Sequence, residues 1–341
     1  MRGEGRPRHK NLPVFIPHLG CPNDCVFCNQ RAISGRRFFD EEEALGGLRR
    51  AMADVREGET AEIAFFGGSF TGIDRGLMIR LLTAAREYLE TGRATSVRCS
   101  TRPDYIDADT VRLLKEYGVG TVELGIQSTD DAVLEASGRG HSAADSRNAC
   151  RTVLEAGLDC VGQMMVGLPL STPENERKTA EDICSFGCSG ARIYPTVVFR
   201  HTRLEAMAKS GEYRPIGNRE AASRCADLIA IFDARGVKLL RVGLCASENL
   251  ASPDEVFAGA SHPAIGEMSM SEVFFRRECE AIEKAGLAGA REITFFVSPG
   301  SVSKAVGQKR DNIRRLCEKY GTSRVKILEK SDLIGYNIPI A

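Results

Sequence analysis

The stretch Pro17-His18-Leu19-Gly20-Cys21-Pro22-Asn23-Asp24-Cys25-Val26-Phe27-Cys28-Asn29 decides how the rest of the chain is interpreted. Its three cysteines, Cys21, Cys25 and Cys28, are spaced C-x3-C-x2-C. Thiolates this close together on one loop can ligate a single metal centre, and three is one fewer than the four that usually hold a cubane iron–sulfur cluster. A cluster held by three cysteines leaves one iron open to a further ligand. The proline, asparagine and aspartate between the first two cysteines favour a turn, so the segment can wrap around such a centre.

Two simpler interpretations of the loop compete with a cluster. A zinc knuckle would take His18 as its fourth ligand, and three buried thiols would bind no metal at all. With the aromatic Phe27 directly before the last cysteine, however, the motif resembles the signature of the radical S-adenosylmethionine (radical SAM) enzymes. Later stretches of the chain resemble the same family in the same order, which favours the cluster.

The resemblance implies a specific chemistry for this loop. Cys21, Cys25 and Cys28 would bind a [4Fe-4S] cluster, and Phe27 would lie in the cofactor site. The open iron would chelate S-adenosylmethionine, and one electron would cleave it to methionine and a 5′-deoxyadenosyl radical that abstracts a substrate hydrogen. Such an enzyme needs a reducing electron donor of the flavodoxin or ferredoxin type.

Composition places few limits on partners. The 341 residues include 46 basic and 46 acidic side chains, so the net charge gives no reason to expect binding to nucleic acid or to a membrane. No run approaches the roughly 18 apolar residues of a spanning helix, and the polar, basic start has no apolar leader. We expect residues 1–12 to be a flexible basic tail. The 12 cysteines suit a reducing cytoplasm.

Short apolar runs alternate with amphipathic segments up to residue 200, which predicts parallel βα units. The expected strands are 14–16, 61–66, 97–100, 121–126, 159–166 and 191–198, and the expected helices are 40–57, 74–90, 108–117, 142–156 and 172–186. The pattern fits an incomplete (β/α)6 barrel over residues 13–200, as in the radical SAM family. An open doubly wound sheet is the alternative, but no strand is followed by the glycine fingerprint of a dinucleotide fold.

The sequence pattern changes after residue 200, and residues 201–341 predict a smaller α/β extension that extends or covers the open barrel. Its expected helices are 218–235, 271–285 and 310–320, its expected strands are 238–244, 292–297 and 325–328, and 251–266 is expected to be a loop. Several of its stretches resemble the C-terminal extension of the Elongator catalytic subunit. We expect no counterpart of that subunit's acetyltransferase domain, so its transfer-RNA chemistry is not carried over whole.

Cofactor residues are expected at the carboxyl ends of the predicted strands, where parallel α/β folds carry their chemistry. Gly67 and Gly68 follow the second strand and permit close backbone approach. The family has a glutamate after them for the ammonium of S-adenosylmethionine, whereas this chain has Ser69, as in the Elongator-like branch. Thr101, after the third strand, belongs to the same pattern.

Three further polar residues follow the fourth and fifth strands. Gln127 can donate and accept hydrogen bonds, which suits a ribose diol, and the fork of Arg139 suits a carboxylate. The resemblance assigns them to the ribose and the carboxylate of S-adenosylmethionine. Gln163 replaces an aspartate of the coproporphyrinogen dehydrogenase branch and again resembles the Elongator-like branch. Taken alone, Arg139 would be interpreted as a surface arginine.

Other candidates are weaker. Cys184 and Cys188 are spaced C-x3-C, which allows an auxiliary cluster but fits two packed thiols on one helical face better; Met164, Met165, His201 and His262 fit structural roles. Residues 299–310 combine glycines, hydroxyls and the cations Lys304, Lys309 and Arg310, which suits an anion site or a solvated loop equally. The predicted substrate is RNA or a nucleotide-like molecule. A small metabolite is one alternative, and a non-catalytic metal-binding or electron-transfer protein is another.

Overall fold

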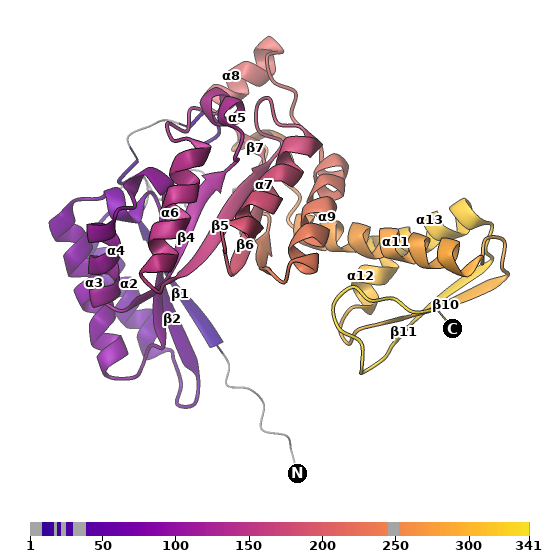
Figure 1. Ribbon diagram of the computed structural model, residues 1–341, viewed down its shortest axis with the longest axis horizontal. Helices are drawn as coiled ribbons and strands as arrows, with labels where there is room; N and C mark the ends of the chain where they lie inside the picture. The colour runs from indigo at the N-terminus through magenta and orange to yellow at the C-terminus, as the bar shows by residue number, and fades with distance from the viewer. Residues whose placement is uncertain (1–8, 17–18, 22–24, 30–38, 245–251, 341) are drawn as a thin grey trace.

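Seven parallel strands form one curved sheet in the computed structural model, which describes residues 9–16, 19–21, 25–29, 39–244 and 252–340 (Figure 1). In spatial order they are β1 (His9–Ile16), β2 (Thr60–Gly67), β3 (Ser96–Thr101), β4 (Val119–Gln127), β5 (Asp159–Val166), β6 (Gly190–Pro195) and β8 (Lys238–Val242). Every neighbouring pair is parallel, and β1 and β8 form the two edges. The predicted partial barrel is confirmed, with a seventh strand because β8 of the extension pairs with β6. β1 begins at His9, inside the segment expected to be a tail.

Helices cover the outer face of this sheet (Figure 1). They are α2 (Glu41–Ala53), α3 (Arg75–Glu90), α4 (Ala108–Glu116), α6 (Ala143–Glu155), α7 (Pro173–Ser185) and α9 (Asn218–Ala234). Local sequence sets where they start. The side chains of Asp40, Asp74 and Asp107 each accept a hydrogen bond from the first turn, and Ser142 with Asp145 forms the expected capping box.

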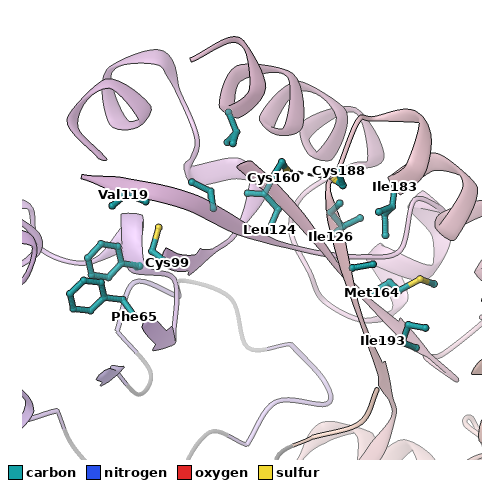
Figure 2. Packing of buried hydrophobic residues seen from close by; sticks show 14 of the residues in the cluster. Phe65, Cys99, Val119, Leu124, Ile126, Cys160, Met164, Ile183, Cys188 and Ile193 are labelled. Atoms are coloured by element: carbon teal, nitrogen blue, oxygen red, sulfur yellow. Dashed lines mark hydrogen bonds between the residues drawn. The ribbon is translucent and has the colours of Figure 1, made fainter. Parts of the chain in front are cut away.

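The two faces of the sheet differ in chemistry because side chains alternate along each strand. The outer positions are apolar and fully buried against the helices, among them Phe65, Cys99, Leu124, Met164 and Ile193 (Figure 2). Met164 therefore packs in the core, as expected. The inner positions carry charged and amide side chains, including Glu62, Arg98, Glu123, Gln163 and Arg192. The concave face of the partial barrel is polar.

The sixth predicted strand and the loop expected at 251–266 are both corrected. The strand splits after Pro195, and β7 (Val197–Phe199) leaves the sheet to pair antiparallel with β9 (Val256–Gly259). Thr196 marks the division, since its backbone nitrogen and its hydroxyl both donate to the carbonyl of Val166. The two strands are far apart in the chain, so no turn motif between them predicts the pairing. The short helices α5 (Asp131–Ala136) and α8 (Arg203–Ser210) were also not expected.

A smaller lobe projects from the barrel beyond α9 (Figure 1). It is carried by α11 (Ile265–Ala285), which begins before the expected residue 271, and contains β10 (Glu292–Val297), α12 (Val302–Val306), α13 (Asp311–Tyr320) and β11 (Arg324–Glu329). β10 and β11 are parallel, and their apolar residues join α11 in a core separate from that of the barrel. None of the helices in the described part of the chain has the length and apolarity to cross a bilayer.

Candidate cofactor site

The cysteine loop follows β1 at the carboxyl end of the sheet. Cys21 and Cys28 are exposed, Cys25 is partly buried, and none of the three is in a disulfide. The backbone of Val26 anchors the loop, because its nitrogen donates to the carbonyl of Ser137 at 3.1 Å and its carbonyl accepts from Leu204 at 2.8 Å. The amide of Asn29 donates to the Arg200 carbonyl at 3.2 Å. Distant segments thus hold the loop. His18, the fourth ligand of a zinc knuckle, lies outside the described residues.

Gly67 and Gly68 bring the loop after β2 into backbone contact with the cysteine loop. A Cβ at Gly68 would lie 2.0 Å from the carbonyl oxygen of Leu19, and one at Gly67 would lie 2.5 Å from that of Ile16. The Gly68 nitrogen donates to the Ile16 carbonyl at 2.7 Å. Such distances exclude any side chain, so these glycines fix where the cysteines stand relative to β2.

Ser69 ties the ends of β2 and β3 together. Its hydroxyl lies 2.9 Å from that of Thr101 and accepts a hydrogen bond from the backbone nitrogen of Arg102 at 3.0 Å. The Thr101 hydroxyl also lies 2.6 Å from that of Thr71. Ser69 and Thr101 are both buried, and their hydroxyls bond to protein groups. Their part in the site is to shape the floor beneath the cysteine loop.

Arg139 reaches the cysteine loop from the turn after α5. One terminal nitrogen donates to the Cys25 sulfur at 3.3 Å and the other donates to the Gly125 carbonyl at 2.7 Å. Arg102 donates to the Arg139 carbonyl and pairs with Asp104. Although Cys21 is exposed as a residue, desolvation of its thiol by the surrounding protein is the largest influence and raises its pKa, Cys25 raises it further, and the two arginines oppose both effects. Two buried guanidinium groups therefore supply positive charge where thiolates would gather.

Gln127 ends β4 in a strained conformation. Its φ of 65° is unusual for a residue other than glycine, and its side-chain oxygen Oε1 is buried without a hydrogen-bond partner among the described residues. A Cβ at Gly125 would lie 3.1 Å from the Gln127 amide nitrogen and 3.3 Å from a terminal nitrogen of Arg139. The two side chains predicted for one cofactor thus converge over Gly125.

His141, which the sequence analysis missed, lies beside this pair. Its Nε2 is 3.2 Å from the Ile126 carbonyl, which can only accept, so Nε2 carries the proton and Nδ1 is left as a buried acceptor. Burial, then Arg139 and Arg102, lower the pKa of His141 to about 4. The imidazole is therefore neutral near pH 7. In the sequence, His141 directly follows Gly138-Arg139-Gly140, so its closeness to the predicted cofactor arginine was the available signal.

Gln163 belongs to a charged network on the inner face. Its amide donates to Glu123 at 2.9 Å and to Ser100 at 3.2 Å. Glu123 is fully buried and also accepts from Arg98 at 2.8 Å and from Arg192 at 2.8 and 2.9 Å. Burial raises the pKa of Glu123, but the bonds from Arg192, Arg98 and Gln163 outweigh burial and leave it lowered. The sequence signal for this network was the single charged residue between two apolar ones in each of β3, β4 and β6.

The remaining candidates pack against other parts of the chain. Phe27 packs at the edge of an apolar cluster that includes Val198 and Leu204. His262 accepts from the Ala264 backbone nitrogen through Nδ1, as a structural histidine does. α7 ends at Ser185, so Cys184 and Cys188 do not share a helical face as expected.

The predicted anion loop lies in the smaller lobe. Of its three cations, Lys309 lines a cavity of about 350 Å³ between α9, α11 and the start of α13. Arg219, Arg314 and Arg315 line the same cavity, and Glu272 and Asp311 offset part of their charge. The cavity is therefore cationic, and it is separate from the cysteine loop.

Comparisons with known proteins match most of the chain. Residues 15–183 match the family model described as the Radical SAM superfamily, and residues 188–273 match the model described as the Radical_SAM C-terminal domain. The tRNA uridine(34) acetyltransferase of Dehalococcoides mccartyi is 28% identical over 256 residues, which cover 64% of this chain and 56% of that protein. Elongator complex protein 3 of Saccharomyces cerevisiae is 30% identical over 263 residues, covering 64% and 46%. The chain thus spans about half the length of these relatives.

The fold has a counterpart among solved structures. An N-terminally truncated archaeal Elp3 from Methanocaldococcus infernus superposes with a TM-score of 0.60 at 21% identity, covering 84% of this chain and 66% of that one. Identity this low establishes likeness of fold alone. The last barrel strand ends at Val242, and the aligned 84% of the chain is longer than the segment up to that residue. The alignment therefore extends past the barrel into the smaller lobe.

Proposed function

Because this chain belongs to the radical SAM superfamily, we propose that Cys21, Cys25 and Cys28 hold a [4Fe-4S] cluster whose open iron takes S-adenosylmethionine. The observation that carries the proposal is the contact of Arg139 with Cys25, which ties a thiol of the motif to the predicted cofactor arginine. When bound, the cluster supplies one electron that cleaves S-adenosylmethionine to methionine and a 5′-deoxyadenosyl radical.

The residues of this chain fit that group. Three thiols on one loop offer one ligand fewer than a cubane has irons, and the buried guanidinium groups of Arg102 and Arg139 offset the negative charge of three thiolates. The Oε1 atom of Gln127, buried without a partner among the described residues, can accept a hydrogen bond from a ribose hydroxyl. Arg139 supplies positive charge for the carboxylate of the methionine moiety.

The substrate in this proposal is RNA. Two relatives that match the chain over 64% of its length are named for tRNA uridine acetylation and for the Elongator complex, and both are longer than this chain. The polar inner face suits a polar substrate, and there the Arg192 guanidinium lies 5.6 Å from the ring of Phe66. An electron donor of the flavodoxin or ferredoxin type completes the reaction. We place the activity in a reducing cytoplasm, which suits a protein whose described cysteines form no disulfides.

Anaerobic reconstitution tests the cofactor assignment. Protein incubated with iron and sulfide is expected to bind about four of each per chain and, once reduced, to release 5′-deoxyadenosine from S-adenosylmethionine. Cys25→Ala should lose both properties, while Cys317→Ala, at a partly buried thiol of the smaller lobe, should keep both. A colourless protein that binds zinc and no iron would favour the non-enzymatic alternative.

RNA binding tests the substrate assignment separately. Reversing Lys304, Lys309 and Arg310 to glutamate should abolish binding of transfer RNA at low salt while leaving substrate-free cleavage of S-adenosylmethionine intact. The matched control reverses Lys284, Arg324 and Lys330, three exposed cations of the same lobe. Equal losses in both variants would remove the loop at 299–310 as the RNA surface. Absence of RNA binding by the unmutated protein would replace RNA with a small metabolite.

A further inference from the structure

Three buried thiols meet in the core, away from the candidate cofactor site. Cys150 comes from α6, Cys160 from β5 and Cys188 from the turn that leads into β6. The Cys188 sulfur lies 3.6 Å from that of Cys160 and 3.9 Å from that of Cys150, and all three sulfurs lie within 4.8 Å of one another. Figure 2 shows Cys160 and Cys188 side by side between the sheet and its helices.

The spacing of these sulfurs matches a single shared ion. Zinc–sulfur bonds of about 2.3 Å in a tetrahedral site place two ligand sulfurs about 3.8 Å apart. In a cubane cluster each cysteine ligates a different iron, so its cysteine sulfurs stand farther apart than sulfurs that share one ion. The trio therefore fits one thiophilic ion and does not fit an auxiliary iron–sulfur cluster.

We propose that Cys150, Cys160 and Cys188 form a three-thiolate zinc site, with the fourth position on the ion open to a small external ligand. Cys184, in the last turn of α7, is partly exposed and is not one of the cysteines whose sulfurs lie within 4.8 Å of one another. The site unites Cys188, which was flagged by its spacing, with two cysteines that the sequence left scattered.

The segments that carry Cys150 and Cys188 border the surface between α6 and the end of α7. A surface depression of about 400 Å³ there is lined by Arg147, Arg151, Leu154, Glu155, Ser185 and Phe186. Two of these residues fall between Cys184 and Cys188 in the chain, and Arg147 and Arg151 flank Cys150 on α6.

Binding replaces thiol protons with metal bonds. Each cysteine that ligates Zn²⁺ releases one proton to solvent, so affinity rises with pH. Three thiolates around Zn²⁺ leave one net negative charge. The ion would fasten α6, which starts after Arg139, to β5, which carries Gln163.

The test starts from protein that lacks the cysteine motif, so that zinc cannot bind there. The background variant carries Cys21→Ser, Cys25→Ser and Cys28→Ser. After incubation with ZnCl₂ and removal of loosely held metal, it should retain about one zinc per chain by elemental analysis. Cobalt in place of zinc should give an intense sulfur-to-metal charge-transfer band. Adding Cys188→Val should abolish both signals, whereas Cys99→Val, at a buried cysteine with no thiol neighbour among the described residues, should leave them unchanged.

Thermal unfolding gives a second readout that does not need a folded Cys188 variant. Zinc should raise the melting temperature of the background protein, by more at pH 8 than at pH 6 because thiol protons are released. The proposal would be overturned if the background variant retained no zinc. It would also be overturned if zinc were still retained after Cys160→Val and Cys188→Val were added to that variant. A background protein whose melting temperature ignores zinc at both pH values would overturn it as well, because the trio would then be sulfur packing alone.

Discussion

The guanidinium of Arg139 donates a hydrogen bond to the thiol of Cys25 at 3.3 Å, across 114 residues of chain. Its other terminal nitrogen holds the carbonyl of Gly125 at 2.7 Å. The arginine therefore joins the carboxyl ends of β1 and β4, and it does so from a buried position. Replacing Arg139 with a neutral residue therefore changes the charge at the cysteine loop and leaves the cysteines themselves in place.

Arg139→Ala should weaken binding of S-adenosylmethionine by roughly ten- to a hundred-fold, because charge-assisted hydrogen bonds contribute about 1.5–3 kcal/mol. Arg139→Lys should recover part of the loss, since lysine keeps the charge but not the fork. Equilibrium dialysis on reconstituted protein measures this. Arg151→Ala, at an exposed arginine of α6, is the control. An unchanged affinity in Arg139→Ala would remove this residue from the cofactor site.

Gln127→Gly and Gln127→Ala should both lower affinity for S-adenosylmethionine, by only a few-fold, because a neutral hydrogen bond contributes about 0.5–1.5 kcal/mol. They should differ in stability. The φ of 65° at this position suits glycine, so the glycine variant should be more stable than the alanine variant by about 1 kcal/mol. Urea unfolding of both proteins measures the difference. Equal midpoints would show that the backbone relaxes once the amide is gone.

Gly68→Ala should displace the cysteine loop, because the new Cβ would stand 2.0 Å from the Leu19 carbonyl oxygen. We expect a loss of about 1–3 kcal/mol in unfolding free energy, as for overpacked cores, together with reduced iron content after reconstitution. Gly120→Ala provides the matched control, since nothing lies within 4 Å of a Cβ there. Normal iron content in Gly68→Ala would mean that the two loops can separate without harm.

Glu123→Gln should destabilise the barrel at neutral pH by about 3–5 kcal/mol, because Arg192 would lose its buried carboxylate partner and Arg98 would keep only Glu62. The folded pKa of Glu123 is lowered, so its contribution is present above the unfolded pKa and is lost as the pH falls through the folded value. The deficit of the variant should therefore shrink in acid. Unfolding by urea between pH 3 and pH 7 measures it, with the exposed Glu116→Gln as control.

Glu278 should show the opposite dependence. It is fully buried in α11, both carboxylate oxygens lack a partner among the described residues, and burial raises its pKa well above the usual range. Its contribution to stability is greatest below the unfolded pKa and falls as the pH rises toward the folded value. Glu278→Gln should remove that decline, so its stability relative to the parent should improve from pH 5 to pH 8. The exposed Glu280→Gln should show no such trend.

The partial barrel could be predicted because its signals are local. Apolar runs, capping residues and the cysteine spacing each lie within a few residues, and parallel strands bring their carboxyl ends to one edge. Gly67, Gly68, Gln127 and Arg139 therefore fell near the cysteine loop without any knowledge of side-chain directions.

What could not be predicted depends on contacts between distant segments. The pairing of β7 with β9 joins two short apolar runs across an extended stretch of chain. Cys150, Cys160 and Cys188 sit on three elements, and no spacing rule relates them. The ion pairs of Glu123 required knowing which face of each strand is concave.

The early position of the cysteine loop sets an order of events during synthesis. Asn29 and Cys25 leave the ribosome long before Arg200 and Arg139, their partners 171 and 114 residues later in the chain. At about 5–20 residues per second, the thiols wait on the order of ten seconds for the arginine. During that interval the thiol of Cys25 lacks its hydrogen bond from Arg139. Cluster insertion after translation therefore acts on a different chemical environment from insertion on the nascent chain.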